Sequence, residues 1–229
     1  MHPQPDKSIW VAVPAYNEGA AVGRAVAELL RCSYQVVVVD DGSSDDTAAR
    51  AQTAGAMVVR HPVNLGQGAA LQTGISFALR QGADIVVTFD ADGQHRAAEV
   101  DNLVAALLAH TADFALGSRF LGATVAMPTS RRILLKLATA FTRLTTGLRV
   151  SDTHNGLRAM TRRGASAIAL RQNRMAHASE FLDQVARSGL PYVEVPVTIE
   201  YNAYSLAKGQ GLGGSLKILV DLSTQRLQR

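Results

Sequence analysis

The segment Gln35–Asp46, which reads QVVVVDDGSSDD, carries the pattern on which the fold prediction depends. Its four consecutive valines predict a buried β-strand, and the acidic, glycine-containing turn that follows ends the strand. Ser44 is the expected N-cap of the next helix, because Asp45 and Asp46 would then lie in its first turn and interact favourably with the helix dipole. A strand, a polar turn and a helix in this order are typical of an α/β domain.

The same alternation continues on both sides of this segment. Strands are predicted at Ile9–Val13, Gln35–Asp40, Met57–His61, Asp84–Asp90 and Phe114–Ser118, and helices at Ala20–Arg31, Asp45–Ala54, Gln67–Arg80 and Ala97–His110. This pattern predicts a mostly parallel sheet flanked by helices. After Ser118 the alternation loosens into a helix at Arg131–Thr146, a loop, a helix near Ala178–Ser188, a strand near Tyr192–Ile199 and a terminal helix near Leu212–Leu227. Since no linker interrupts the chain, residues 1–229 are predicted to form a single domain.

Composition limits the class of protein. With 229 residues, 47% of them hydrophobic and 18% charged, the chain suits one globular domain with a real core. The single cysteine, Cys32, excludes an intramolecular disulfide and a multi-thiolate zinc site. The polar start Met1–Ser8 leads directly into a strand, and no segment is long and apolar enough to span a bilayer. We therefore expect a cytoplasmic protein without a signal peptide or a membrane span.

Polar and acidic residues follow three of the predicted strands. These strand ends read PAYNE at Pro14–Glu18, DDGSS at Asp40–Ser44 and DADGQH at Asp90–His95. Ligands of open parallel sheets collect beyond the carboxyl ends of the strands, where these carboxylates would repel one another unless a cation or ligand hydroxyls lay between them. Mg²⁺ or Mn²⁺ takes carboxylate and amide oxygens and can bridge the two phosphates of a sugar nucleotide. Taken singly, an Asp-Gly pair such as Asp41-Gly42 or Asp92-Gly93 is an ordinary turn signal. The occurrence of three polar, acidic strand ends in one sheet favours a metal–diphosphate site.

The motifs also resemble a known family. The segments VPAYNE at Val13–Glu18, VDDGSSDDT at Val39–Thr47, NLGQG at Asn64–Gly68 and DADGQH at Asp90–His95 are similar to those of family 2 inverting glycosyltransferases, which have the GT-A fold. The match runs in order over residues 9–120, and it implies a nucleotide-sugar-binding half with a Mg²⁺ or Mn²⁺ cofactor. The residues implied in nucleotide-sugar binding are Pro14, Ala15, Tyr16, Glu18, Asp41, Gly66, Gln67, Asp90, Ala91 and Asp92, of which Asp90 and Asp92, together with Gln94, would bind the metal.

The second half extends the resemblance. The segments GSRF at Gly117–Phe120, SDTHNGLR at Ser151–Arg158 and VEVPV at Val193–Val197 are similar to the subgroup that contains dolichyl-phosphate mannose synthase and bacterial polyprenyl-phosphate glycosyltransferases. The resemblance implies that residues 121–229 form the acceptor side and that Lys208 stands where a basic residue meets phosphate. Many members of the subgroup carry transmembrane helices after this point and this sequence shows none, which leaves room for a separate small membrane protein as a partner.

The helix predicted at residues 130–146 is basic and amphipathic. At ~100° per residue, Arg132, Lys136 and Arg143 share one narrow sector, and a set of apolar residues lies opposite: Leu134, Leu137, Phe141 and Leu144. Such a helix can lie on an anionic membrane at its cytoplasmic face or offer cations to a phosphate acceptor. The ordinary alternative is a solvated basic face over an apolar face that packs on the core.

The type of acceptor decides which residues are catalytic candidates besides Asp92. A polyprenyl phosphate is already an anion and needs positioning cations, for which Arg119, Arg132 and Lys208 are the candidates. A saccharide hydroxyl, as in surface polysaccharide or lipopolysaccharide synthesis, needs a general base, and Asp152 or Glu180 would supply it. We predict inverting transfer from a UDP- or GDP-sugar to polyprenyl phosphate, with the saccharide acceptor as the alternative.

Other classes fit less well. The sequence Gly66-Gln67-Gly68 invites a dinucleotide-binding interpretation, but Leu71 stands where that fingerprint needs glycine or alanine. No P-loop is present, and Val13–Glu18 lacks the glycine-rich, basic loop of a nucleotidyltransferase. A catalytically silent sugar-nucleotide-binding protein remains a further alternative. Nucleic-acid binding is not expected, since only the net charge of +4 favours it and no motif or aromatic platform accompanies that charge.

Overall fold

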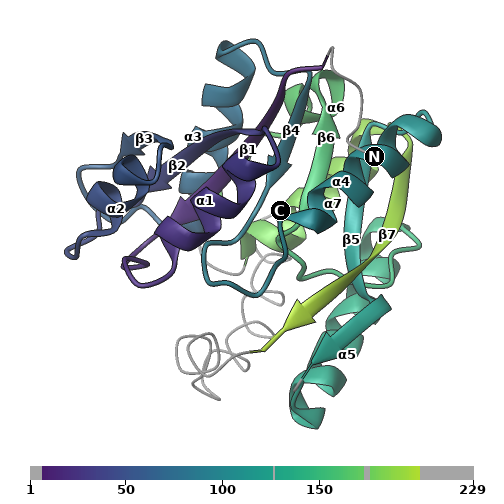
Figure 1. The fold of residues 1–229 in the computed structure, drawn as a ribbon. Coiled ribbons are helices and arrows are strands. Elements are labelled where there is room, and N and C mark those ends of the chain that lie inside the picture. Colours follow the sequence, from purple (N-terminus) through teal and green to yellow (C-terminus); the bar gives the residue numbers. More distant parts are fainter. Residues whose placement is uncertain (1–6, 126, 173–175, 202–229) are drawn as a thin grey trace.

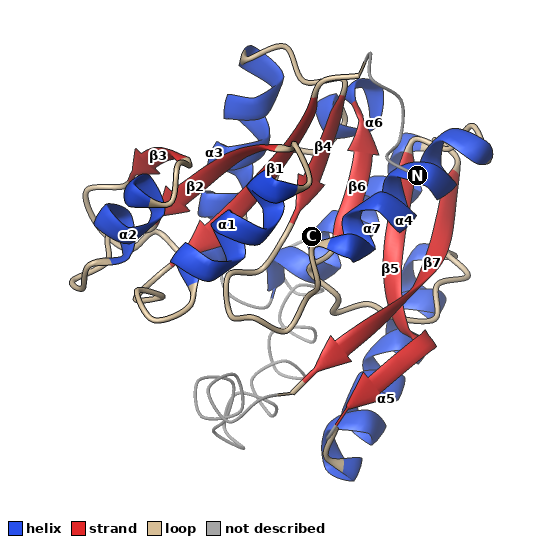
Figure 2. Ribbon diagram, in the orientation of Figure 1, coloured by secondary structure: helices blue, strands red, loops and turns tan. Residues whose placement is uncertain are grey.

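The structure is a computed structural model that describes residues 7–125, 127–172 and 176–201. Within these residues seven strands form one sheet in the order β3-β2-β1-β4-β6-β5-β7 (Figure 2). The strands are β1 (Ile9–Ala15), β2 (Gln35–Asp40), β3 (Met57–Arg60), β4 (Ile85–Thr88), β5 (Phe114–Val125), β6 (Arg158–Thr161) and β7 (Tyr192–Glu200). The helices are α1 (Val22–Arg31), α2 (Thr47–Thr53), α3 (Gln67–Arg80), α4 (Ala98–Ala109), α5 (Thr129–Thr146), α6 (Arg162–Ser166) and α7 (Ala176–Ser188).

The sheet is mostly parallel, as the sequence predicts. Strand β1 pairs in parallel with β2 and β4, β2 with β3, and β5 with β7, whereas β6 runs antiparallel between β4 and β5. The order of the strands reverses at β1, since β2 lies on one side of it and β4 on the other. At such a point the loops that leave neighbouring strands diverge to opposite faces of the sheet and open a crevice.

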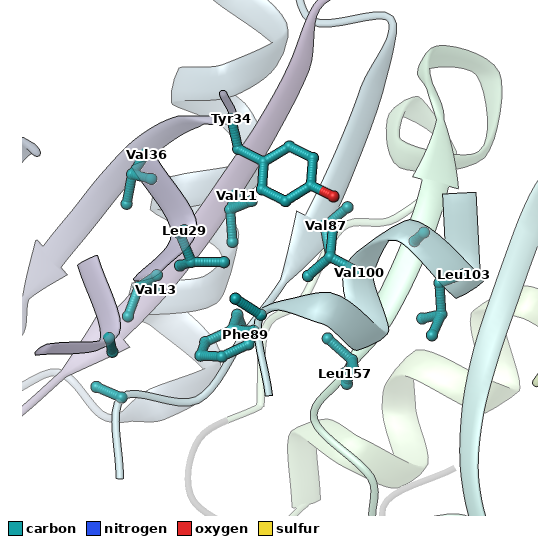
Figure 3. Close-up of a cluster of buried hydrophobic side chains, with 14 of the residues drawn as sticks. Val11, Val13, Leu29, Tyr34, Val36, Val87, Phe89, Val100, Leu103 and Leu157 are labelled. Carbon is teal, nitrogen blue, oxygen red and sulfur yellow. The ribbon is translucent and has the colours of Figure 1, made fainter. Parts of the chain in front are cut away.

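Each face of the sheet has its own hydrophobic core, because successive side chains of a strand point to opposite faces. Val11 and Val13 of β1 belong to the core beneath α1 and α4, together with Leu29, Val100 and Leu103 (Figure 3). Trp10 and Ala12, which alternate with those valines, belong to the second core, beneath α3, α6 and α7. Coverage of both faces explains why the central strands read as continuous apolar runs.

One predicted cap is wrong. Helix α2 begins at Thr47 with Asp46 in the N-cap position, two residues later than the predicted cap, Ser44. The side chain of Asn17 accepts a hydrogen bond from the Ser44 N–H over 2.9 Å, so this residue belongs to the preceding loop. Asp45 accepts the Thr47 N–H over 3.0 Å instead.

The segment between α5 and α7, predicted as a loop, contains strand β6 and helix α6. Four residues are too few to show a strand period, and arginine begins this strand. Pairing with β4 on one side and β5 on the other buries Ala159 and Met160 and holds the strand in place. The predicted terminal helix Leu212–Leu227 and Lys208 lie outside the described residues.

The ends of two strands extend beyond the rest of the sheet. Strands β5 and β7 run on together past the other strands to the corner where α5 lies (Figure 1). Tyr201 follows β7 directly, and the Arg131 guanidinium at the start of α5 lies 5.0 Å from the centroid of its ring. This geometry brings the start of α5 next to the sheet edge where the polar strand ends gather.

Candidate active site

A cleft of about 470 Å³ opens at the carboxyl ends of β1 and β4, where the strand order reverses. It is lined by all ten residues predicted to bind the nucleotide sugar, and by Gln94. Further lining residues come from elsewhere in the chain: Asn64, Ala70, His95, Arg119, Arg131, His154, Asn155, Gly156, Arg158, His177, Ala178 and Ile199. The structure therefore brings the predicted donor residues together in one place, while their individual binding roles stay predictions.

Asp41 anchors one wall of this cleft. Its carboxylate accepts the backbone N–H groups of Leu65 over 2.9 Å and Gly66 over 2.7 Å, and it lies 2.7 Å from Nδ1 of the buried His61. The neighbouring Gly42 has a φ of 73°, and a Cβ there would come within 2.6 Å of the Val63 backbone. The Asp41-Gly42 pair therefore fixes the loop that leads into α3, beside the cleft.

Asp90 and Asp92 differ in how the protein compensates their charges. Asp90 accepts a hydrogen bond from the Gln67 side chain over 3.2 Å, and its other oxygen lies 3.3 Å from His95 Nε2. Burial acts to raise the pKa of Asp90, but His95 and the nearby charges of His177 and Arg158 together hold that pKa below its usual value. Burial, and then the charge of Asp90, raise the pKa of Asp92 to about 6. Of the two carboxylates, Asp92 is thus the one whose charge the surrounding residues compensate less.

The residues around this acid pair fit a divalent cation that a ligand completes. Among the described residues no group of three or more His, Cys, Asp or Glu side chains could enclose a metal by itself. Mg²⁺ in phosphate-handling proteins is commonly held by one or two carboxylates and the phosphates of the substrate. Asp90, Asp92 and the side-chain amide of Gln94 offer that partial set, and the backbone N–H of Gln94 donates to the Asp92 carboxylate over 3.0 Å.

Arg119, which also lines the cleft, forms a buried ion pair with Asp152. Its Nε donates to the Asp152 carboxylate over 2.6 Å, and the two side chains are 5% and 0% exposed. Its two terminal nitrogens donate to Tyr201 Oη over 2.8 Å and to the His154 carbonyl over 2.5 Å. Arginine carries five side-chain N–H donors, so two remain after these bonds within the described residues.

A second cavity, of about 770 Å³, lies beside the first and shares Arg119 with it. Arg132, Lys136 and Arg143 line it from α5, and its described lining includes no aspartate or glutamate. The helix sector predicted from the sequence therefore faces this cavity, whereas the adjacent Arg131 lines the first cleft. The first cleft thus contains the acid pair together with Arg119, Arg131 and Arg158, whereas the charged residues in the described lining of the second cavity are all basic.

Comparison with known proteins identifies the family. The family model described as glycosyl transferase family 2 matches residues 10–168, which is more than half of the chain. The chain belongs to this family. The family resemblance of its motifs is thereby confirmed, and the protein is a family 2 glycosyltransferase.

Two similar relatives and one solved structure extend this result. A UDP-N-acetylglucosamine–dolichyl-phosphate N-acetylglucosaminyltransferase of Methanococcus voltae is 30% identical, with 95% of this chain and 95% of the relative aligned. A polyprenol monophosphomannose synthase of Mycolicibacterium smegmatis is 31% identical over 91% of this chain and 83% of its own. Glucosyl-3-phosphoglycerate synthase from Mycobacterium tuberculosis, crystallised with Mn²⁺, UDP-glucose and phosphoglyceric acid, superposes with a TM-score of 0.74 at 23% identity, covering 96% of this chain and 79% of its own. This likeness confirms the predicted GT-A fold.

The structure of this glycosyltransferase places neither proposed general base in the cleft. Asp152 accepts two hydrogen bonds from Arg119 and one from the His154 N–H, and its side chain is fully buried. Glu180 lies on α7 and lines a separate cavity next to α5, where it accepts the backbone N–H groups of Arg171 and Gln172 over 2.8–3.1 Å. Both carboxylates hold parts of the chain together outside the described lining of the cleft, and a role of either as a general base stays a prediction.

The glycosyltransferase also has cleft residues to which the sequence assigned no role. Arg158 is buried, its Nε donates to the Asn155 carbonyl over 3.0 Å, and its guanidinium lies 4.2 Å from the Phe181 ring centroid. Burial lowers the pKa of Arg158 to about 10, against the opposing charges of Asp90 and Asp152, so it stays cationic at neutral pH. The sequence did contain a signal for a role of Arg158 in the site, since this arginine ends the segment SDTHNGLR and is followed by the apolar residues Ala159 and Met160.

Gly156 provides a test of the acid pair that removes no polar group. A Cβ at Gly156 would collide with the Asp90 carboxylate and come within 2.6 Å of its Cγ. We therefore expect Gly156→Ala to displace Asp90 and to lower Mn²⁺-dependent donor binding by roughly tenfold or more, because cation ligation depends on ligand geometry. Calorimetry with a nucleotide sugar and Mn²⁺ measures the change.

Gly189→Ala is the control for this variant, because no atom lies within 4 Å of a Cβ there, although its φ of 64° makes that change strained as well. If donor binding in Gly156→Ala equalled that of the wild type, the claim that Asp90 takes part in Mn²⁺-dependent donor binding would be wrong. It would also be wrong if the two variants lost the same amount of binding.

Proposed function

We propose that this glycosyltransferase moves a sugar, with inversion, from a UDP- or GDP-sugar to a polyprenyl-phosphate lipid carrier, using Mg²⁺ or Mn²⁺. The single observation that carries the proposal is the shared position of Arg119, between a cleft with an acid pair and a cavity lined by cations. An acid pair suits a cation–diphosphate, and a basic cavity suits an anionic acceptor. Two relatives whose names specify dolichyl phosphate and polyprenol support the lipid carrier.

The donor end of the site is assigned to the acid pair and the strand ends. Asp90, Asp92 and Gln94 would hold the cation against the diphosphate, while Pro14–Glu18 and Asp41 contact the base and ribose. When bound, the cation supplies Lewis-acid stabilisation to the leaving diphosphate. The neighbouring structure was crystallised with Mn²⁺ and UDP-glucose, which supports a nucleotide-sugar donor used together with a divalent cation.

The acceptor end is assigned to Arg119 and Arg131, which both line the cleft. The remaining N–H donors of Arg119 would orient the acceptor phosphate, and Arg132 in the adjoining cavity would attract it. A phosphate oxygen attacks the anomeric carbon as the bond to the diphosphate oxygen breaks, and the nucleoside diphosphate leaves with the electron pair. Since an ionised phosphate has no proton to lose, this reaction needs no general base, in keeping with the positions of Asp152 and Glu180.

Helix α5 supports contact with a membrane. It docks through Leu135, Ala138, Thr139 and Thr142, and none of these belongs to the apolar face predicted from the sequence. Within the part of the chain that the structure describes, Ile133 is 57% exposed, Leu137 56% and Leu144 86%. The helix contains no acidic residue, and its exposed apolar row runs beside the row of Arg132, Lys136 and Arg143. We assign this double row to the surface of an anionic leaflet.

No helix among the described residues combines the length and apolar character needed to cross a bilayer. We propose that contact through α5 is peripheral. A separate small membrane protein stays a proposed partner of the same face.

The double variant Leu137→Glu/Leu144→Glu tests the membrane assignment. We expect its affinity for vesicles that contain anionic phospholipid to fall by roughly tenfold or more, because two leucines lose apolar transfer energy and two repelled charges are added. Sedimentation with vesicles measures binding, and donor binding in solution should not change. Met57→Glu is the matched control, since Met57 is 50% exposed on the edge strand β3. Equal vesicle binding by the double variant and the wild type would refute the assignment.

The overall proposal is tested by a donor screen. Release of nucleoside diphosphate is measured for UDP- and GDP-sugars, with and without Mn²⁺, in the presence of polyprenyl phosphate or of saccharide acceptors. We expect release that needs both the cation and the lipid phosphate. Transfer to a saccharide hydroxyl alone would favour the alternative acceptor, and binding without turnover would favour a catalytically silent protein.

A further inference from the structure

The turn at residues 152–156 connects the two ends of the site. The His154 carbonyl accepts a hydrogen bond from Arg119 over 2.5 Å, at the acceptor end. Gly156 packs against the Asp90 carboxylate, at the donor end, and its carbonyl accepts the Thr88 hydroxyl over 2.6 Å. In a direct displacement the transferred sugar lies between the diphosphate and the acceptor. Residues 154 and 155 of this turn therefore flank the position of the sugar.

Two nitrogens on this turn lack hydrogen-bond partners. His154 Nε2 and Asn155 Nδ2 are both buried and have no partner among the described residues, although both residues line the cleft. The other polar atom of each side chain is in use, since His154 Nδ1 lies 2.8 Å from Thr153 Oγ1 and Asn155 Oδ1 accepts the Leu157 N–H over 3.0 Å. One bond thus fixes each side chain. Because buried polar groups are nearly always paired, each of these nitrogens calls for a partner that the described residues do not supply.

The chemistry of these two groups fits a neutral ligand. Burial, together with the charges of Arg119 and Arg158 and against that of Asp152, lowers the pKa of His154 to about 4, so the ring is uncharged at neutral pH. Asparagine is uncharged as well, and the neighbouring arginines already provide for anions. A sugar hydroxyl both donates and accepts, so it can pair with His154 Nε2 in either tautomer of the ring. Asn155 Nδ2 donates only, to a hydroxyl or amide oxygen of the sugar.

We propose that His154 and Asn155 bind hydroxyl or amide groups of the transferred sugar and thereby select among sugars carried on the same nucleotide. This inference rests on the proposed function, because a nucleotide-sugar donor is what places a sugar between Asp90 and Arg119. It adds two specificity residues to the site, outside the strand ends that bind the nucleotide.

Calorimetry with Mn²⁺ tests the inference with three probes. They are the nucleotide sugar that the wild type binds most tightly, its epimer on the same nucleotide, and the free nucleoside diphosphate. In His154→Ala and in Asn155→Ala, we expect the affinity for the preferred sugar nucleotide to fall roughly tenfold and its preference over the epimer to shrink. Affinity for the nucleoside diphosphate should stay within about twofold of wild type, because neither residue would contact the nucleotide.

Two further variants separate specificity from folding. His154→Gln keeps a side-chain donor and should recover part of the lost preference, while His110→Ala, at the exposed end of α4, should change none of the three affinities. Equal losses for the sugar nucleotide and the nucleoside diphosphate, or an unchanged epimer preference, would overturn the inference. If the wild type itself bound no nucleotide sugar, that result would contradict the proposed function, and with it the inference that depends on that function.

Discussion

Replacing Asp92 by asparagine is expected to lower cation-dependent donor turnover by roughly a thousandfold or more, since a metal ligand stabilises the leaving diphosphate by several kcal/mol. Asp90 already has His95, His177 and Arg158 around it, whereas Asp92 has the charge of Asp90 beside it and a pKa raised, by burial first, to about 6. The amide keeps the shape of the side chain and removes the charge that the cation would meet. Nucleotide release at saturating Mn²⁺ measures the effect.

The control for Asp92 is another carboxylate of this protein. Asp183→Asn removes one charge on α7, where Asp183 pairs with Arg187 at 3.0 Å, far along the chain from the strand ends. We expect it to keep wild-type turnover. Chelation of the cation should reduce the wild type to the level of Asp92→Asn. If turnover persisted in Asp92→Asn, or in the wild type after chelation, the claim that a cation bound by Asp92 is needed for turnover would be wrong.

Arg119→Lys is expected to lower transfer to polyprenyl phosphate by roughly a hundredfold, while donor affinity changes less than about threefold. Lysine keeps the positive charge beside Asp152 but cannot reproduce the fork that reaches Asp152, Tyr201 and the His154 carbonyl together. The acceptor phosphate then loses its oriented donors. Transfer rate and donor affinity, measured separately by product formation and by calorimetry, show which of the two is lost.

Folding needs its own control at this position. Removing only one partner of a buried ion pair costs about 3–5 kcal/mol, so Arg119→Ala would confuse unfolding with lost chemistry. Arg119→Met combined with Asp152→Asn removes both charges and leaves no buried ion unpaired. We expect the double variant to fold, as seen in its thermal melting, and to bind donor without transferring to the lipid phosphate. If donor affinity fell in parallel with transfer, Arg119 would belong to the donor site instead.

The first half of the fold could be predicted because local patterns and tertiary structure agree there. The predicted helix Gln67–Arg80 and the strand Gln35–Asp40 match the observed α3 and β2 in both limits. Apolar runs bounded by polar turns leave few alternatives. Strand β6 could not be predicted, since its four residues are held by pairing with β4 and β5 and not by local preference. The prediction of Ser44 as an N-cap is wrong because a residue distant in sequence, Asn17, accepts a hydrogen bond from the Ser44 N–H and holds Ser44 in the preceding loop.

The candidate site likewise has features that the sequence could predict and features that depend on tertiary packing. The strand-end motifs could be placed together from topology alone, because parallel strands bring their carboxyl ends to one edge. Arg131 lines the cleft and Arg132 the second cavity, and this difference depends on the rotation of α5 about its own axis as it packs on the rest of the protein. A helical wheel gives the sectors of a helix but not the sector that docks. For the same reason the sequence could not show that Leu137 and Leu144 stay exposed in the described structure.

The most direct measurement is the binding of nucleotide sugars to the intact chain by calorimetry, with and without saturating Mn²⁺ or Mg²⁺. The account predicts that at least one UDP- or GDP-sugar binds only when the cation is present, and that Asp92→Asn abolishes this binding. Absence of binding by every activated sugar under saturating cation, or equal binding after complete chelation, would contradict the claim that the acid pair holds a cation and a diphosphate.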